Sequence, residues 1–453
     1  MSGRKRRPMM QYDTLVYNGS VMTLNPAFDM IEDGVVGIRD GRIATVAKRK
    51  GDISAYPARA RHDADGGLIL PGLVNTHGHL PMSLFRGLAD DLPLAEWLNA
   101  HIFPAEQRHI NPAAIRTGTR LSCLEMLLSG TTTGCDGYFY EDAVAEAVHE
   151  MGMRAVLAQG VIDFPAPGVP EPARNVEAAA EYVERWQNVS PLIQPSIFCH
   201  SSYTCGPETL TRAKEAALRA GVCLQIHVAE TRDEVEQIKA ARGVSPVRFL
   251  HDLGVLDRGT LASHAVWVDA RDIDILAGTG AAIAHNPESN MKLASGTAPV
   301  PRFLEAGIAV GLGTDGCASN NNLDMFAEMD TAAKLHKVMA ADPTVMNARA
   351  VLRMATIEGA RALGLDAEIG SIEPGKAADL IVVNTRKPHL TPMYHPESHL
   401  VYAAGGADVR DVFIQGQLRV CNRELPGHDA AGIMAEAREL GRRIAVADRV
   451  GAR

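Results

Sequence analysis

The chain lacks two features that would place it in large classes of proteins. It has no run of eighteen consecutive apolar residues, the length that a membrane-spanning helix needs. It also has no excess of positive charge, because 45 Lys and Arg stand against 54 Asp and Glu, for a net charge of −9. Nonspecific binding to nucleic acid or to anionic membranes is therefore not expected. The expected partner is a small molecule.

Cysteine is scarce, and its pattern does not suit a disulfide framework. The seven cysteines are odd in number and widely spaced, at positions 123, 135, 199, 205, 223, 317 and 421. Reduced thiols in a cytoplasmic protein are expected. The basic cluster at residues 4–7 is followed by no apolar run, so it predicts a disordered tail and not a signal peptide.

Two nucleotide-related motifs are incomplete or missing. The segment GSIEPGK, residues 370–376, nearly fits a phosphate-binding loop, but Ala377 replaces the hydroxyl residue that would hold magnesium. It also stands between a helical and a strand pattern, which is the wrong order. The zinc-binding pair of motifs H-x-E and P-C-x-x-C does not occur. Neither chemistry is therefore expected here.

Short apolar runs alternate with helical patterns from residue 69 to about residue 316, as in repeated βα units. Eight strands are predicted, at 69–75, 131–138, 153–161, 193–200, 222–229, 259–268, 280–286 and 308–315. Eight parallel strands close a (β/α)8 barrel of the TIM type. A chain of 453 residues is long enough for such a barrel and a smaller second domain.

Both chain ends show strand-like alternation around this barrel. We predict a composite β-sandwich domain from residues 9–68 and 374–425, a barrel over 69–373, and a C-terminal helical segment over 426–453. The pair Asp40 and Gly41 predicts a hairpin turn in the first part. Helices are predicted over 112–130, 346–364 and 429–447.

The run LPGLVNTHGH, residues 70–79, ends in the pair His77 and His79. Side chains at i and i+2 of a strand share one face, so both imidazoles can reach one metal ion. An isolated pair of this kind would more often be polar turn residues. Whether His77 and His79 are metal ligands or turn residues is therefore judged from the other polar residues at the ends of predicted strands.

Further histidines and an aspartate fall at the carboxyl ends of predicted strands, where barrels keep their active sites. They are His200, His227, His264 and Asp315. The proposed ligand set is His77, His79, His227 and Asp315. These donors suit one divalent ion, either zinc, the first expectation, or ferrous iron, and they do not suit calcium or magnesium. Such an ion lowers the pKa of a bound water to about 7.

Glu230 follows His227 by three residues and can reach the same pocket. A partly desolvated carboxyl stays protonated and can donate to a substrate ring nitrogen. Its alternative role is a residue at the start of a helix. His264 can contact the attacking oxygen, and Asp315 can take its proton and pass it to the leaving group.

The chain resembles the amidohydrolase superfamily over nearly its whole length, and within it the 5′-methylthioadenosine/S-adenosylhomocysteine deaminases. The resemblance is carried by PGLVNTHGHLPMSLFRGLADDLPLAEWL (71–98), HIFPAE (101–106), HSSYTCGPE (200–208), HVAET (227–231), SHAVWV (263–268), HNPESNMKLASG (285–296), GTDGCASNNNLDM (313–325) and EPGKAADLIVV (373–383). Some members of the superfamily bridge two metals with a lysine. This chain has no lysine between Lys50 and Lys214. The resemblance therefore implies a single-metal site.

The resemblance also implies residues that would bind substrate. Glu106 matches a position that accepts ribose hydroxyls, His200 one that contacts the nucleoside, and Trp97 one that shapes the pocket. Ser289 and Asn290 match the loop after the seventh strand. Relatives that accept S-adenosylhomocysteine use arginine after the third strand. Arg174 is the arginine that this chain offers there, either as a substrate contact or as a solvated loop residue.

The implied reaction is hydrolytic deamination at C6 of an adenosine-type nucleoside, with Glu230 protonating N1, to give the inosine product and ammonia. The shorter 5′-methylthioadenosine is favoured over S-adenosylhomocysteine. The alternatives are an aminohydrolase or chlorohydrolase of purine bases or triazines, and a non-catalytic assembly protein of the same fold. A cytoplasmic enzyme is expected, and a homo-oligomer is compatible with the sequence.

Overall fold

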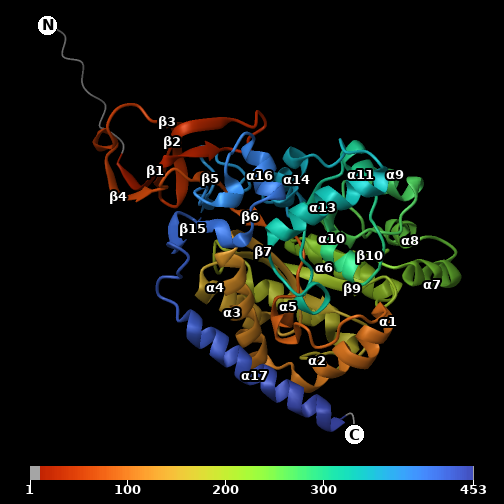
Figure 1. Ribbon diagram of the computed structural model, residues 1–453. Coiled ribbons are helices and arrows are strands. Elements are labelled where there is room, and N and C mark those ends of the chain that lie inside the picture. The colour runs from red at the N-terminus through yellow and green to blue at the C-terminus, as the bar shows by residue number, and fades with distance from the viewer. Residues whose placement is uncertain (1–10, 452–453) are drawn as a thin grey trace.

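The computed structural model describes residues 11–451, and the basic cluster at residues 4–7 lies outside this range. Within the described residues the strands form two eight-stranded sheets (Figure 1). The barrel sheet consists of β6 (Leu73–Val74), β7 (Thr131–Tyr138), β8 (Arg154–Val161), β9 (Ile193–Ser201), β10 (Leu224–Val228), β11 (Thr260–His264), β12 (Ala282–His285) and β13 (Val310–Leu312). The eight predicted barrel strands are thereby confirmed, most of them shorter than expected.

The barrel strands are parallel and follow one another in chain order from β6 to β13. Backbone hydrogen bonds bring the two ends of this order together. The Thr76 amide donates to Leu312 O at 2.9 Å, and the Asp315 amide donates to His77 O at 3.0 Å. These bonds place the segment after β6 beside the segment after β13. The first and last sections of the barrel therefore meet where the metal ligands were predicted.

The second sheet combines both ends of the chain, as predicted. Its strands are β1 (Tyr12–Met22), β2 (Met30–Arg39), β3 (Arg42–Lys48), β4 (Ala58–Asp63), β5 (Leu68–Pro71), β14 (Leu380–Val383), β15 (Val409–Ile414) and β16 (Gln417–Val420). The antiparallel pairing of β14 with β5 joins the two halves. The turn between β2 and β3 has positive φ at Asp40 and Gly41, 52° and 74°, as the predicted hairpin requires.

One predicted strand proves to be two. The segment 69–75 was expected to be a single barrel strand, but β5 within it pairs with β1 and β14 of the second sheet. The barrel begins only at β6, after Gly72. A Cβ at Gly72 would lie 2.1 Å from Thr132 Oγ1, so only glycine permits this close crossing between the sheets.

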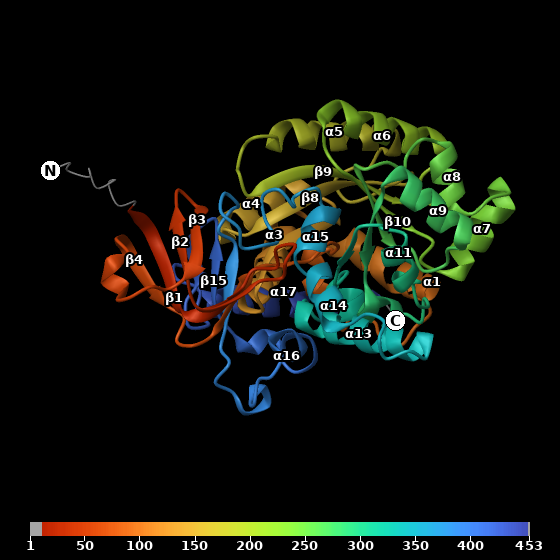
Figure 2. The same cartoon turned by 90° about the horizontal axis from the view of Figure 1, so that it is seen from above.

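The described residues form seventeen α-helices, most of which surround the barrel (Figure 2). They are α1 (Leu94–Glu96), α2 (Phe103–His109), α3 (Pro112–Leu128), α4 (Glu141–Met151), α5 (Asn175–Trp186), α6 (Pro207–Ala220), α7 (Arg232–Arg242), α8 (Pro246–Asp252), α9 (Ala270–Thr279), α10 (Pro287–Lys292), α11 (Val300–Glu305), α12 (Cys317–Asn320), α13 (Met325–Ala340), α14 (Ala348–Met354), α15 (Ile357–Ala362), α16 (Pro396–Tyr402) and α17 (Ala430–Gly451). Shorter helical segments are η1 (Ile53–Ala55), η2 (Leu80–Phe85), η3 (Trp97–Ile102), η4 (Pro172–Arg174), η5 (Pro388–Leu390) and η6 (Gly406–Asp408).

The predicted helix over 112–130 is confirmed as α3. Asn111 caps it by accepting from the amides of Ala113 and Ala114, both at 3.1 Å, and Pro112 occupies its first turn. The C-terminal helix is confirmed as α17, which runs along α3 in Figure 1. The helix predicted over 346–364 is instead two helices, α14 and α15. Thr356 interrupts it with φ −135° and ψ −100°.

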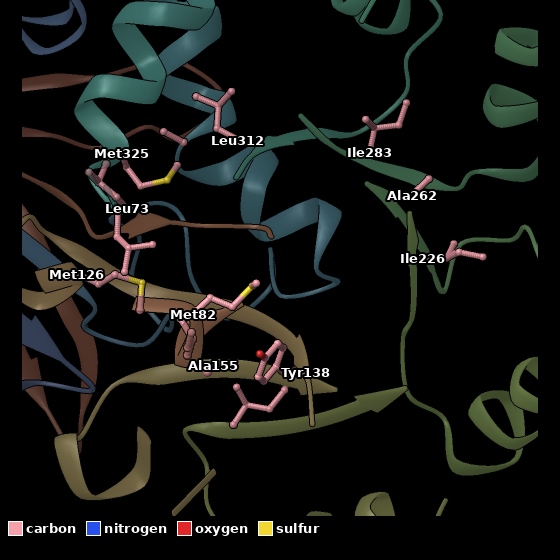
Figure 3. Close-up of a cluster of buried hydrophobic side chains, with 14 of the residues drawn as sticks. Leu73, Met82, Met126, Tyr138, Ala155, Ile226, Ala262, Ile283, Leu312 and Met325 are labelled. Carbon is pink, nitrogen blue, oxygen red and sulfur yellow. The ribbon is translucent and has the colours of Figure 1, made fainter. Parts of the chain in front are cut away.

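The main hydrophobic core lies between the barrel strands and the surrounding helices. Figure 3 shows part of it, with Leu73, Ile226, Ala262, Ile283 and Leu312 contributed by five different strands. A separate cluster of buried hydrophobic side chains packs on the second sheet. Within residues 11–451 the seven cysteines are free thiols, as predicted, and no helix is both long and apolar enough to span a membrane. The barrel is thus a closed scaffold that presents its strand ends to one side.

Candidate active site

The predicted metal residues meet at the carboxyl ends of the barrel strands. His227 is the fourth of the five residues of β10, and Asp315 lies three residues after β13. His77 and His79 follow β6 and do not lie in a strand, contrary to the sequence argument. Their segment is held instead by the Asn75 amide, which donates to Thr133 O, and by the Thr76 amide. The two imidazoles converge because neighbouring strands pin this segment.

The ligand atoms of these residues are close enough to share one ion. His77 Nε2 lies 3.2 Å from His227 Nε2. Asp315 Oδ1 lies 3.3 Å from His77 Nε2 and 3.3 Å from His79 Nε2. Ligand atoms of the three histidines all fall within 4.8 Å of one another. Those of His77, His264 and Asp315 form a second such group.

The opposite ring nitrogens show which atoms are available to a metal. His79 Nδ1 lies 2.8 Å from Gly137 O, and a carbonyl only accepts, so Nδ1 carries the hydrogen. His77 Nδ1 lies 3.1 Å from Ser263 Oγ, which can accept its hydrogen in the same way. The Nε2 lone pairs therefore face one another and a carboxylate oxygen. Acceptors gathered in this way require a cation, so the residues present fit a bound metal ion.

Asp315 is held in place through both carboxylate oxygens. Oδ2 accepts from Ser289 Oγ at 2.7 Å and from Ser319 Oγ at 2.8 Å, and Oδ1 accepts from the Gly316 amide at 2.8 Å. Gly313 allows the approach, since a Cβ there would lie 2.4 Å from Asn286 Oδ1 and 2.9 Å from His77 Cβ. The carboxylate is thus oriented toward the histidines before any ligand binds.

Three strand ends at the site adopt left-handed backbone conformations without glycine. The φ angles are 50° at Ala229, 72° at His264 and 59° at Asp315. Such conformations are uncommon outside glycine and cost free energy unless their surroundings enforce them. Their concentration beside the metal residues shows that the fold holds these side chains in directions that local preference would not choose.

Glu230 and His264 lie beside the ligand group. Burial raises the pKa of the Glu230 carboxyl, which favours its protonated form. Its Oε2 lies 3.8 Å from His264 Nε2, and its Oε1 accepts from Ser295 Oγ at 3.5 Å. His264 Nδ1 lies 2.9 Å from Asn290 Oδ1, so Nε2 faces the site. The geometry places the Glu230 carboxyl and the His264 imidazole side by side.

These groups open into a cavity, here called the inner pocket. Its lining includes every predicted substrate-binding residue except Arg174, together with His79, Met82, Tyr138, Phe139, Phe198, Tyr203, His227, Glu230, His264, Leu293, Asp315 and Ser319. The carboxyl groups of Glu106, Glu230 and Asp315 therefore line the same cavity as several aromatic rings.

Glu106 lies in α2 with only 5% of its surface exposed. Tyr138 donates to its Oε1 at 2.5 Å. Burial raises the pKa of Glu106 to about 7. Trp97 in η3 lines the same cavity, with its Nε1 donating to Ala89 O at 3.0 Å. The structure thus brings both residues to the pocket, as predicted.

His200 also faces the inner pocket. Its ring centroid lies 5.2 Å from that of His227, its Nδ1 lies 2.9 Å from Thr204 Oγ1, and burial lowers its pKa to about 3. Arg174 is the predicted site residue that the structure does not bring there. Its side chain is 61% exposed in η4 and pairs with Glu181 at 3.0 Å. This geometry supports the interpretation of Arg174 as a solvated loop residue.

Sequence reasoning missed three residues that support the site, namely Tyr138 at the end of β7, Ser263 in β11 and Ser319 in α12. Ser319 stands four residues after Asp315, and this helical spacing could have indicated it. Ser263 stands next to His264 but points to His77. No local pattern distinguishes Tyr138 or Ser263 from ordinary buried residues.

The fold and the site define a metal-dependent barrel hydrolase. The chain belongs to the amidohydrolase family, whose sequence profile matches residues 68–419, and within it to the branch of 5-methylthioadenosine/S-adenosylhomocysteine deaminases. A deaminase of that name from Syntrophobacter fumaroxidans is 49% identical over 432 residues, covering 95% of this chain and 98% of the relative. It follows that the chain is a hydrolase acting on C–N bonds.

Two further similarities bear on the site. A 5′-deoxyadenosine deaminase from Methanosarcina mazei is 43% identical over 433 residues, covering 95% of this chain and 98% of the relative. The crystal structure of an adenosine deaminase from Xanthomonas campestris with bound zinc superposes with a TM-score of 0.94 at 38% identity. It covers 97% of this chain and all of that chain.

Proposed function

We propose that this protein deaminates adenosine-type nucleosides at C6 with one zinc ion, held by His77, His79, His227 and Asp315. The observation that carries the proposal is the position of Glu106. This buried carboxylate lines the same inner pocket as the metal residues and Glu230, so one molecule can contact both. A bare base has no ribose hydroxyls to donate to Glu106. The three relatives named above are nucleoside deaminases, and their names support the same class of substrate.

When bound, the metal supplies Lewis-acid activation of a water molecule at neutral pH. Glu230, whose pKa is raised by burial, donates its proton to N1 of the purine ring, which makes C6 more electrophilic. His264 Nε2 faces the attacking oxygen, and Asn290 holds that ring in place. Asp315 accepts one proton of the attacking water and passes it to the amino group, which leaves as ammonia. The second proton of that water returns to Glu230 as the C6 carbonyl forms.

Substrate is held on the sugar side by Glu106, whose carboxylate can accept from both ribose hydroxyls. His200 presents the ring nitrogen opposite its Thr204 contact to the nucleoside. No arginine or lysine lines the inner pocket among the described residues. The neighbouring Phe103 and Phe139 give the 5′ end apolar surroundings. We therefore expect uncharged 5′ groups, such as methylthio, methyl and hydroxyl, to be accepted best in the inner pocket.

A substrate panel tests the proposal directly. The loss of adenine absorbance is followed for 5′-methylthioadenosine, 5′-deoxyadenosine, adenosine, S-adenosylhomocysteine, adenine, guanine and a triazine. We expect kcat/KM to be highest for the first two compounds. Turnover of a base or triazine above every nucleoside would reject the proposal.

The runner-up function is an aminohydrolase or chlorohydrolase of purine bases or triazines, which shares the metal residues. Glu106→Ala distinguishes the two. It should lower nucleoside turnover strongly if the carboxylate binds ribose, and an enzyme for bare bases should scarcely respond. A non-catalytic assembly protein would show neither turnover nor stoichiometric metal, and metal analysis of the purified protein tests for that case.

A further inference from the structure

The inner pocket continues into a second cavity that the proposed reaction does not use. We call it the vestibule. Five residues line both cavities: Leu94, Leu98, Phe103, Tyr203 and Leu293. With the purine ring at Glu230 and the ribose hydroxyls at Glu106, the 5′ carbon is the free end of a bound nucleoside. A long 5′ substituent has this shared apolar wall to pass along.

The vestibule differs from the inner pocket in its charges. It is lined by two cations, Arg232 and Lys292, and by the exposed carboxylates Asp91 and Asp233. Lys292 is already engaged, since its Nζ donates to Asp90 Oδ1 at 2.6 Å. Arg232 has no such ion pair among the described residues, and its guanidinium lies 4.5 Å from the centroid of the Trp267 ring. A free guanidinium thus lines this cavity.

The guanidinium is held in a fixed place by its support. Trp267 donates from Nε1 to Ser295 O at 2.7 Å, which fixes the indole ring. Ser295 Oγ in turn donates to Glu230 Oε1 at 3.5 Å. The stacked arginine is therefore connected to the proposed catalytic acid through two residues, Trp267 and Ser295, and it follows that acid by two positions in the chain. Stacking on an indole orients a guanidinium while leaving its N–H groups free to bind a carboxylate.

Helix stability does not account for Arg232. It is the first residue of α7, where the positive end of the helix disfavours a cation. Local preference would place an acidic residue there, as Asp233 and Glu234 show at the next two positions. A cation that opposes the local preference, stacked beside a cavity, is typical of a binding residue.

We propose that Arg232 and Trp267 form a subsite for the carboxylate of a zwitterionic amino-acid group at the end of a 5′-thioether, as in S-adenosylhomocysteine. The inference rests on the proposed function, because the nucleoside part must occupy the inner pocket. Asp91 and Asp233 provide negative charge in the same cavity for the α-ammonium group. Arg232 and Trp267 would thus determine how well a long zwitterionic 5′ group is accepted relative to an uncharged one.

The test compares Arg232→Met with Arg242→Met. Arg242 is at the other end of α7 and stacks over Phe249 at 5.1 Å, but it lines neither cavity, so it is a matched control for loss of charge and stacking. For each protein, kcat/KM is measured with 5′-methylthioadenosine, with S-adenosylhomocysteine, and with the 5′-(3-aminopropylthio) analogue that lacks the carboxylate.

Arg232→Met should lower kcat/KM for S-adenosylhomocysteine by about tenfold or more, mainly through KM, as expected for loss of a charge-assisted hydrogen bond. The other two compounds should change by less than about twofold. Arg242→Met should change none of them. Equal losses for all three compounds, or no loss for S-adenosylhomocysteine, would overturn the subsite.

Failure of the subsite can be separated from failure of the proposed function. If the unmodified protein turns over 5′-methylthioadenosine but not S-adenosylhomocysteine, the subsite is wrong and nucleoside deamination stands. If it turns over no nucleoside at all, nucleoside deamination itself is wrong, and the subsite with it.

Discussion

Two clusters of buried histidines lie at the ends of barrel strands, and only one has the composition of a metal site. His77 and His227 approach within 3.2 Å through their Nε2 atoms, and His285 at the end of β12 approaches His336 of α13 within 3.0 Å in the same way. All four rings are buried. Judged by the contact between the rings alone, the two clusters could not be told apart.

The clusters differ in what surrounds the rings. Asp315 Oδ1 lies 3.3 Å from His77, and His79 adds a third imidazole. The described residues provide no carboxylate ion pair for His285 or His336, so one ring donates to the other and the pair is neutral. Burial lowers the pKa of His336 to about 4. The oriented carboxylate and the third imidazole therefore distinguish the metal site, and a close pair of histidines by itself does not make one.

The largest expected effect sharpens this contrast. His227→Ala should remove the metal and reduce deamination to background, because a ligand is lost from a site whose other donors cannot compensate. His336→Leu should keep full metal content and turnover within about threefold, but lower Tm, because it leaves a buried imidazole without its partner. Elemental analysis, turnover and thermal unfolding are measured on both variants. Equal loss of metal from the two variants would show that the two histidine clusters do not differ in metal binding.

Glu230→Gln separates catalysis from metal binding within the first cluster. The amide keeps the size of the carboxyl but cannot give up a proton, so turnover should fall by at least about 100-fold while metal content is unchanged. The measurement is kcat with 5′-methylthioadenosine alongside elemental analysis. Retained turnover would show that another group protonates the ring.

Glu106 should make the reaction depend on pH near neutrality. Its raised pKa, about 7, means that the acceptor form is lost as the pH falls through 7, so kcat/KM for nucleosides should fall below that pH. Glu106→Gln should lower kcat/KM by roughly tenfold and flatten this acidic limb, since a neutral amide accepts hydroxyl hydrogens less strongly. An unchanged acidic limb in the variant would assign it to a different group.

The raised pKa of Glu106 has the opposite effect on the stability of the fold, which should fall as the pH rises. A carboxyl whose folded pKa lies above its unfolded value of 4.5 stabilises the fold when protonated, and this advantage is lost as the pH rises from about 4.5 through 7. The Tm of Glu106→Gln minus the Tm of the unmodified protein should therefore be more positive at pH 8 than at pH 5. Thermal unfolding at the two pH values checks the sign.

The smallest effect is expected from the residues that orient Asp315. Ser289→Ala removes one of the two hydroxyl donors to Oδ2 and leaves Ser319, so metal affinity should fall by about tenfold, with turnover scarcely changed at saturating zinc. Competition with a chelator measures the affinity. A matched Ser319→Ala variant should behave alike, and the double variant should be weaker than either. Unchanged affinity in the double variant would show that these hydroxyls do not support the metal.

Much of the fold was predictable because its signals are local. The apolar strand runs, the cap at Asn111 and the turn at Asp40 and Gly41 each depend on a few neighbouring residues, and each prediction is confirmed. The division of the segment 69–75 between two sheets was not predictable, because the partner of β5 is β14, some 300 residues away, as the pairing of Pro71 with Leu380 shows.

The sequence by itself determined the chemical types at the site, since His77, His79, His227, Glu230 and Asp315 could be chosen from strand ends and family motifs. Only the tertiary structure decided which donors meet. It turned His285 toward α13, left Arg174 in solvent and placed Arg232 over Trp267. The physical reason is that spacing along a strand limits the face a side chain occupies. The partner on that face is set by the closure of the barrel and the packing of helices distant in sequence.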